Sequence, residues 1–330
     1  MLTRRFLRVK AFKILFSYAY SDNDSLLHAE KDLRASLEKT YDLYHYLLSA
    51  IIAVADYAEE RIEIGLRKFK PSEAEANPNK KFINNEVITI LRENTALQKH
   101  NAKQHLNWRE HADVIKQIYI KMMERPYYKD YMSSMSNSFH EELRLVEEFF
   151  RNEFEGNEQI ESMIEETNAY WADDVGFALI SIIRTINNLR PERERDTENI
   201  LMPMFRAPDD EEYVFELLRY SLEHFKEHSQ LAHQYVQNWE SDRIAFVDMA
   251  LIVMGLSEAL AFPSIPVKVT INEYVEIAKY YSTRNSHVFV NGVLDKVIQN
   301  LLHEGVIKKS GRGLIEETII KKPNNKFKHI

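Results

Sequence analysis

Three consecutive helical patterns between residues 239 and 302 constrain the fold of this chain more than any other feature. The first pattern ends before Pro263, and the second begins at Pro266, where a first helical turn tolerates a residue without an N–H. The third begins near Asn285 and Ser286, which are both good N-cap residues. Apolar residues recur at helical spacing, so each helix is predicted to bury one face. They are Ile244, Val247, Leu251, Met254 and Leu256, then Val267, Ile271, Val275 and Ala278, then Phe289, Val290, Val293, Val297 and Leu301.

Composition extends this prediction to an all-α fold for the whole chain. Only 8 Gly and 9 Pro occur in 330 residues, which favours long helices over many tight turns. The hydrophobic content of 45% is enough for a substantial core, and the length favours two cores. The absence of Cys excludes disulfides, thiolate metal sites and cysteine nucleophiles. No apolar run reaches the length needed to cross a bilayer, so we expect a cytoplasmic protein without membrane contact.

The net charge of −8 argues against a protein that coats nucleic acid generally, but the charge is unevenly distributed. Residues 141–166 hold ten acidic side chains against Arg144 and Arg151, whereas both ends of the chain are basic. A local basic patch is enough for phosphate contacts, whatever the sum over the chain. We therefore expect the acidic helices to stay away from RNA, because phosphate would repel them.

Residues 3–20 predict a first helix that Thr3 can cap. Arg5 and Arg8 lie along one flank of this helix. Arginines in a first turn oppose the helix dipole, which suggests another purpose for them, such as binding phosphate. A solvent-exposed basic helix end is the alternative. The face predicted to be buried consists of Leu7, Ala11, Ile14, Leu15 and Tyr18.

Two motifs of the C-terminal region occur in a specific order and spacing. IPVKVTINEYVEIAK spans residues 265–279, and NSHVFVNGVLDK spans residues 285–296. Together they resemble the C-terminal signature of NusB-type transcription antitermination factors. The arginine-rich first helix, the helix over 212–238 and the W-x-x-D-R-I turn after it resemble further parts of that family. The resemblance implies a NusB-like helical bundle that binds RNA and is not an enzyme.

The resemblance also implies partners and site residues. Family members pair with the small-subunit ribosomal protein NusE, bind boxA-like single-stranded RNA of ribosomal transcripts, and act on the RNA polymerase elongation complex without a cofactor or metal. Partner contacts fall on Asp242, Asp248 and the outer face of the helix over 240–261. Phe289, in a first helical turn, is placed to stack on a base, which is worth about 1–3 kcal/mol. The RNA-binding positions are Arg4, Arg5, Arg8, Phe16, Asn285, His287 and Phe289.

This sequence departs from the family at two positions. Asn285 stands where family members often have an acid, and Val253 stands where they often have an arginine. The first departure removes a negative charge beside the expected RNA. The second alters a structural ion pair.

The matched parts, residues 1–20 and 212–303, are separated by residues 21–211, where the family has only a short helix and loops. We predict that residues 21–211 form an inserted helical domain, and that residues 304–330 form a basic, mobile tail. The proline-containing segment 190–210 is the expected boundary. Helical patterns inside the insertion occur over 41–69, 85–99, 107–123, 138–155 and 158–189.

Two other function classes remain open. The first is a helical protein–protein scaffold that does not bind RNA. The second is a zinc hydrolase, because His224, Glu227 and His228 match H-x-x-E-H, with His233 as a possible third ligand. A solvent-facing helix side explains the same residues. We expect no catalytic residues, because the chain has no glycine-rich nucleotide loop and no nucleophile elbow. Ribosomal RNA cytosine methyltransferases with a NusB-like domain need a Cys nucleophile and an α/β domain, and this chain has neither.

Overall fold

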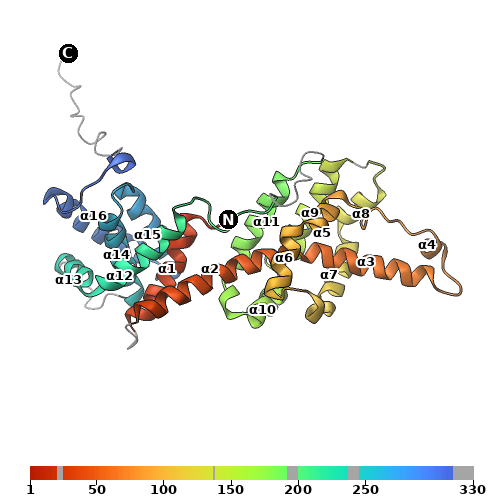
Figure 1. Ribbon diagram of the computed structural model, residues 1–330, viewed down its shortest axis with the longest axis horizontal. Coiled ribbons are helices and arrows are strands. Elements are labelled where there is room, and N and C mark those ends of the chain that lie inside the picture. Colours follow the sequence, from red (N-terminus) through yellow and green to blue (C-terminus); the bar gives the residue numbers. More distant parts are fainter. Residues whose placement is uncertain (21–24, 137, 192–199, 237–244, 315–330) are drawn as a thin grey trace, which may run out of the picture. The chain divides into compact units, whose positions relative to one another are not determined.

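The computed structural model describes residues 1–20, 25–136, 138–191, 200–236 and 245–314. Helices and their connections make up these ranges, which contain no β-strand, so the predicted all-α fold is confirmed (Figure 1). An isolated bridge joins Leu2 to Phe205. Among the helices of these ranges, none combines the length and the apolar character that a bilayer crossing demands.

The described residues form two compact units. We call one the bundle unit, which contains Leu2–Ala35 and the chain from Phe205 onward, and the other the central unit, which contains Met1 and Ser36–Met204. The first division therefore falls inside helix α2 (Leu26–Leu48), not after residue 20, and the second falls seven residues before the predicted position. The role of residues 21–211 as an insertion stays a prediction.

Helix α14 (Phe246–Ala261) is the central helix of the bundle unit. It packs against α1, α12, α13, α15 and α16, so every residue from Asp248 to Ala259 is buried. A helix that is apolar on all sides is expected to be enclosed in this way. Gly255 permits the close approach of α16, because a Cβ at this position would lie 2.8 Å from Leu294 Cδ2. The helices around α14 are α1 (Arg4–Ala19), α12 (Asp210–Glu223), α13 (Phe225–Val236), α15 (Val267–Tyr281) and α16 (Ser286–His303).

Capping residues and prolines in the sequence predicted most of these helix ends correctly. The Thr3 hydroxyl accepts a hydrogen bond from the Phe6 N–H at 3.4 Å, as expected of an N-cap. Pro266 precedes α15 as its N-cap residue, one position earlier than predicted. The single helix predicted over 212–238 is wrong, because His224 has non-helical dihedral angles (φ −103°, ψ 13°) and separates α12 from α13. The break allows α13 to pack against α14 and α16.

The central unit is also built from helices around an aromatic core. Tyr46 stacks between Trp108 and Trp171, with ring centroids 4.3 and 5.3 Å away. The helix predicted over 41–69 is divided at Ser49, and α8 was not predicted. After α2, the helices are α3 (Ala50–Leu66), α4 (Glu73–Ala76), α5 (Glu86–Glu93), α6 (Thr95–Gln104), α7 (Ala112–Glu124), α8 (Pro126–Ser133), α9 (Phe139–Glu153), α10 (Glu158–Thr167) and α11 (Val175–Asn188).

The segment 304–314 is packed on the bundle unit, which corrects the expectation of a mobile tail for this part. Ile307 is buried, and the Ser310 N–H donates to the Pro263 carbonyl at 3.0 Å. Lys309 Nζ donates to the Ala259 and Phe262 carbonyls at 2.8 and 3.1 Å, where α14 leaves carbonyls without helical partners. Burial lowers the pKa of Lys309 to about 8. The remainder of the predicted tail lies outside the described residues.

Candidate nucleic-acid interface

Arg8, the innermost of the predicted RNA-binding arginines, is held inside the bundle unit and is only 3% exposed. Its Nε and NH2 donate to the two carboxylate oxygens of Glu258 at 2.6 and 2.9 Å. Glu258 also accepts hydrogen bonds from the hydroxyls of Tyr213, Thr270 and Tyr274 at 2.6, 2.8 and 3.2 Å. The role predicted for Arg8 is therefore corrected: this side chain joins α1 to α14 and does not present an open guanidinium to RNA.

The electrostatics of this pair are consistent with a permanent ion pair. Burial alone would raise the pKa of Glu258, but the charge of Arg8 and the hydrogen bonds from Arg8 and Tyr213 outweigh burial and hold the pKa below its ordinary value. Glu258 is fully buried, and a buried carboxylate stays ionised only when it is compensated in this way. The group is therefore a structural element of the bundle unit.

Arg5 is the most exposed of the three arginines, with 60% of its side chain open to solvent. Its Nε and NH2 donate to Glu273 of α15 at 2.9 and 2.8 Å, and these hydrogen bonds raise the pKa of Arg5. Arg4 donates to Asp210 and Asp209 at 3.0 and 2.6 Å. In this structure, carboxylates therefore occupy the positions on both arginines that phosphate would take.

The other predicted RNA-binding residues lie at the start of α16 and along α1. Asn285 is exposed at the N-cap of α16, and its side chain makes no capping hydrogen bond. His287 and Phe289 are half-buried in the first turn. Phe16 is half-buried on α1, with its ring 5.6 Å from that of Tyr20. The aromatic rings thus have surface access without being fully exposed.

Helix α15 brings the two groups of residues toward one surface. The Tyr281 ring lies 5.7 Å from the Phe12 ring, and Lys13 Nζ lies 5.4 Å from the same tyrosine ring. Tyr281, the last residue of α15, therefore lies beside the middle of α1, and α16 begins five residues later. A hydrogen bond from Lys279 lowers the pKa of Glu276, and the charges of Arg5 and His287 lower it further. Arg5 is therefore within electrostatic range of Glu276 as well as bonded to Glu273.

Asp248 does not lie on an outer surface, which corrects its predicted contact with a partner. It is 5% exposed and accepts hydrogen bonds from the hydroxyls of Ser282 and Ser286 at 2.6 and 2.8 Å. Its carboxylate thereby ties α14 to the turn before α16. The outer face expected for the helix over 240–261 is equally wrong from Asp248 to Ala259, where every residue is buried. Asp242 lies outside the described residues.

The H-x-x-E-H pattern does not lie on one solvent-facing helix side. His224 is at the break between α12 and α13, whereas His228 is 3% exposed and its Nδ1 lies 3.1 Å from the Ser257 hydroxyl. The expectation that these residues lie on a solvent-facing helix side is therefore wrong for His228, because the break in the helix turns the His228 side chain toward α14. Within the described ranges, no three His, Asp or Glu side chains gather as metal ligands would.

We expect the bundle unit to lose stability as the pH falls from about 6.5 to 4. Burial lowers the pKa of His228 to about 4, so the unfolded chain takes up a proton at a higher pH than the folded chain does. The contribution of neutral His228 to the free energy of unfolding is complete above pH 6.5. Across this window it falls by up to about 3 kcal/mol. Denaturant unfolding at several pH values should show a shallower decline for His228→Gln. The exposed His233→Gln is the control, and equal slopes for the two variants would refute the assignment.

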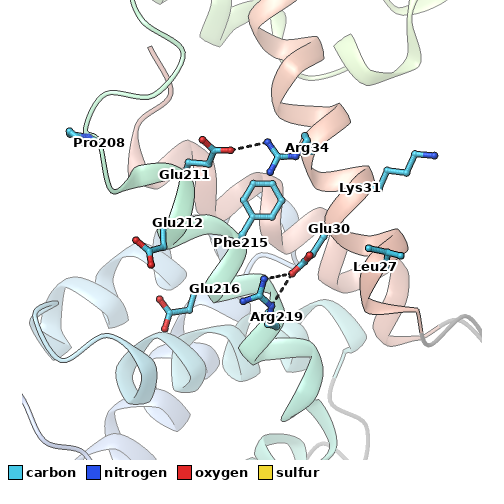
Figure 2. Close-up of a pocket in the computed structure, with 10 residues that line it drawn as sticks. All are labelled: Leu27, Glu30, Lys31, Arg34, Pro208, Glu211, Glu212, Phe215, Glu216 and Arg219. Atoms are coloured by element: carbon cyan, nitrogen blue, oxygen red, sulfur yellow. Dashed lines mark hydrogen bonds and ion pairs between the residues drawn. The ribbon is translucent and has the colours of Figure 1, made fainter.

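An open groove of about 850 Å³ between residues 27–34 of α2 and residues 208–219, which include most of α12, is a second surface of the bundle unit (Figure 2). Arg34 lies over the Phe215 ring, 4.6 Å from its centroid, and pairs with Glu211 at 2.8 Å. Arg219 pairs with Glu30 at 2.6 Å. Glu212 and Glu216 add further negative charge to the lining, so phosphate is disfavoured in this groove.

Sequence analysis did not identify Glu273 as a residue of this surface. It is the residue that holds Arg5, and 268 positions separate the two in the sequence. No local pattern can reveal such a pair. The only available signal was that Glu273 and Arg5 both belong to the segments of the motif resemblance.

Comparison with known proteins gives consistent matches to one family. The model of the NusB family matches residues 178–299, beginning within α11. The transcription antitermination protein NusB of Salinibacter ruber is 38% identical over 125 residues, which cover 36% of this chain and 78% of the relative. That of Methylacidiphilum infernorum is 44% identical over 91 residues, covering 28% and 64%. That of Chloroherpeton thalassium is 36% identical over 100 residues, covering 30% and 47%. No solved structure matches the chain.

Proposed function

Because this chain belongs to the NusB family, we propose that it is an RNA-binding transcription antitermination factor and not an enzyme. One observation supports RNA binding above all: Arg5 is 60% exposed on α1 and holds its guanidinium fork against α15, the helix that ends at Tyr281, five residues before α16 begins. A guanidinium can grip phosphate oxygens in pairs, and a nearby aromatic ring can stack on an unpaired base. This combination suits single-stranded RNA.

The finer features of the proposal come from the family resemblance. We propose that the RNA is a boxA-like element of a ribosomal transcript, that NusE is the protein partner, and that the complex acts on elongating RNA polymerase. Asp242 remains the carboxylate proposed for the partner, whereas Asp248 is withdrawn. This function needs no cofactor. The proposed RNA surface consists of Arg4, Arg5, Phe16, Asn285, His287 and Phe289.

Salt dependence of RNA affinity tests this surface. We expect Arg5→Ala to weaken binding to all single-stranded RNAs and to reduce the slope of log affinity against log salt by about 0.7, because one phosphate contact is lost. Phe289→Ala should weaken binding by about 1–3 kcal/mol with little change in slope, because stacking releases no counterions. Fluorescence anisotropy with a labelled RNA at several salt concentrations measures both quantities.

The matched control is Arg34→Ala, which removes the same charge from the groove of Figure 2. It should leave the salt slope close to that of the wild type. If Arg5→Ala and Arg34→Ala change the slope equally, Arg5 makes no specific phosphate contact and the proposed surface is wrong.

A further inference from the structure

Glu273 lies between two arginines of α1. Its carboxylate receives both hydrogen bonds of the exposed Arg5 fork at 2.9 and 2.8 Å, and Oε2 lies 3.6 Å from NH1 of the buried Arg8. The Glu273 side chain is 16% exposed, so it covers this side of Arg8. Two guanidinium groups thus converge on one carboxylate.

The two arginines are held in place by different means. Arg8 is fixed by Glu258 on its other side, so its NH1 keeps its position when Glu273 moves. The distance of 3.6 Å from NH1 to Glu273 is too long for a hydrogen bond. Arg5, in contrast, is 60% exposed, whereas the side chain of its partner Glu273 is 16% exposed. A phosphate can take over both hydrogen bonds of the Arg5 fork, and displacement of the carboxylate then uncovers a preformed donor on Arg8.

We propose that Glu273 is a specificity-determining residue that occupies, in the free protein, the position of an RNA phosphate. The inference rests on the RNA-binding function proposed above. A phosphate makes the same paired contact with a guanidinium fork that a carboxylate makes, and its tetrahedral oxygens can also reach NH1 of Arg8. RNA binding exchanges one anion for the other. Weakly held anions fail to displace Glu273, whereas RNA that is anchored by neighbouring contacts succeeds.

This exchange predicts a change in both affinity and salt dependence. In the wild-type protein, the RNA releases a cation at this phosphate, and the displaced Glu273 carboxylate attracts a cation only weakly, which offsets a small part of that release. In Glu273→Gln this offset is absent, so the slope of log affinity against log salt should steepen, by less than the value of about 0.7 that a whole phosphate contact contributes for single-stranded RNA. The same substitution removes the competing pair, so affinity should rise by roughly threefold to fivefold.

Glu276→Gln is the matched control for the full-length protein. It removes the same charge from the same helix one turn later, where the carboxylate pairs with Lys279 and acts on Arg5 through charge alone, without a hydrogen bond. The general reduction of negative charge is then equal in both variants. An equal gain of RNA affinity in the two variants would show a general charge effect and would overturn the role of Glu273.

A double-mutant cycle completes the test. The gain in RNA affinity produced by Glu273→Gln should disappear in the Arg5→Ala background, because the ion pair between Arg5 and Glu273 is already absent there. If the gain persists there, Glu273 does not act by competing for Arg5. If the wild type binds no single-stranded RNA, the proposed function itself fails and this inference fails with it. RNA binding that Arg5→Ala weakens but Glu273→Gln leaves unchanged overturns only this inference.

Discussion

Replacing Arg8 by alanine is expected to lower the free energy of unfolding of the bundle unit by about 3–5 kcal/mol. The substitution leaves the fully buried carboxylate of Glu258 without its counter-charge, although the hydroxyls of Tyr213, Thr270 and Tyr274 remain. Removing one partner of a buried ion pair is far more damaging than the pair is stabilising, because the other charge stays desolvated. Differential scanning calorimetry of the full chain should show a lower transition temperature for one of two transitions.

The control for this experiment is Arg5→Ala, which breaks an ion pair of the same chemistry on the same helix. Because Arg5 is 60% exposed, its loss should cost no more than about 1 kcal/mol. Equal stabilities for Arg8→Ala and Arg5→Ala would contradict the buried network. This difference also decides which variant can be used for RNA binding, since only Arg5→Ala is expected to leave the fold intact.

Reversing the charge of Asp248 should have a comparable effect. Asp248→Lys removes the acceptor of two hydroxyl hydrogen bonds and places an ammonium group in a site that is 5% exposed, so we expect a loss of about 3–5 kcal/mol. The turn before α16 should loosen first, because both hydroxyls come from Ser282 and Ser286. Hydrogen exchange of the α16 amides, together with calorimetry, measures the loss.

Two further variants separate packing from charge. Asp248→Asn keeps one acceptor oxygen and should cost about 1–3 kcal/mol. Asp295→Lys applies the same charge reversal at an exposed position of α16 and should change stability by less than about 0.5 kcal/mol. A stable Asp248→Lys protein with normal exchange at α16 would show that the carboxylate is not part of the core.

The sequence was sufficient to predict features that depend on neighbouring residues. The Thr3 cap and the end of α14 before Pro263 follow from local chemistry. The start of α16 at Ser286 was also predicted correctly, although Asn285 makes no capping hydrogen bond there. The break at His224 and the division at Ser49 were missed because neither place has a proline or glycine. There, packing of the following helix overrides a continuous helical pattern.

The candidate site was harder to predict, because residues far away in the sequence determine which of its charged side chains are exposed and which are buried. Arg5 and Arg8 look alike in the sequence, yet one is exposed and the other is buried against Glu258, 250 positions away. The sequence is compatible with either an exposed or a paired Asp248. Only the structure shows that the hydroxyls of Ser282 and Ser286 pair with it. Helical periodicity reports which side of a helix is apolar, but it does not identify the helix that covers a polar residue.

The stack of Trp108, Tyr46 and Trp171 gives the protein a built-in optical reporter. Indole and phenol rings with centroids 4.3 and 5.3 Å apart couple their electronic transitions, which produces near-ultraviolet circular dichroism bands that vanish when the rings separate. All three rings belong to the central unit, and two of the three tryptophans of the chain are among them. Melting of the central unit can therefore be followed optically in the intact chain, while calorimetry records the bundle unit alongside it, without cutting the two apart.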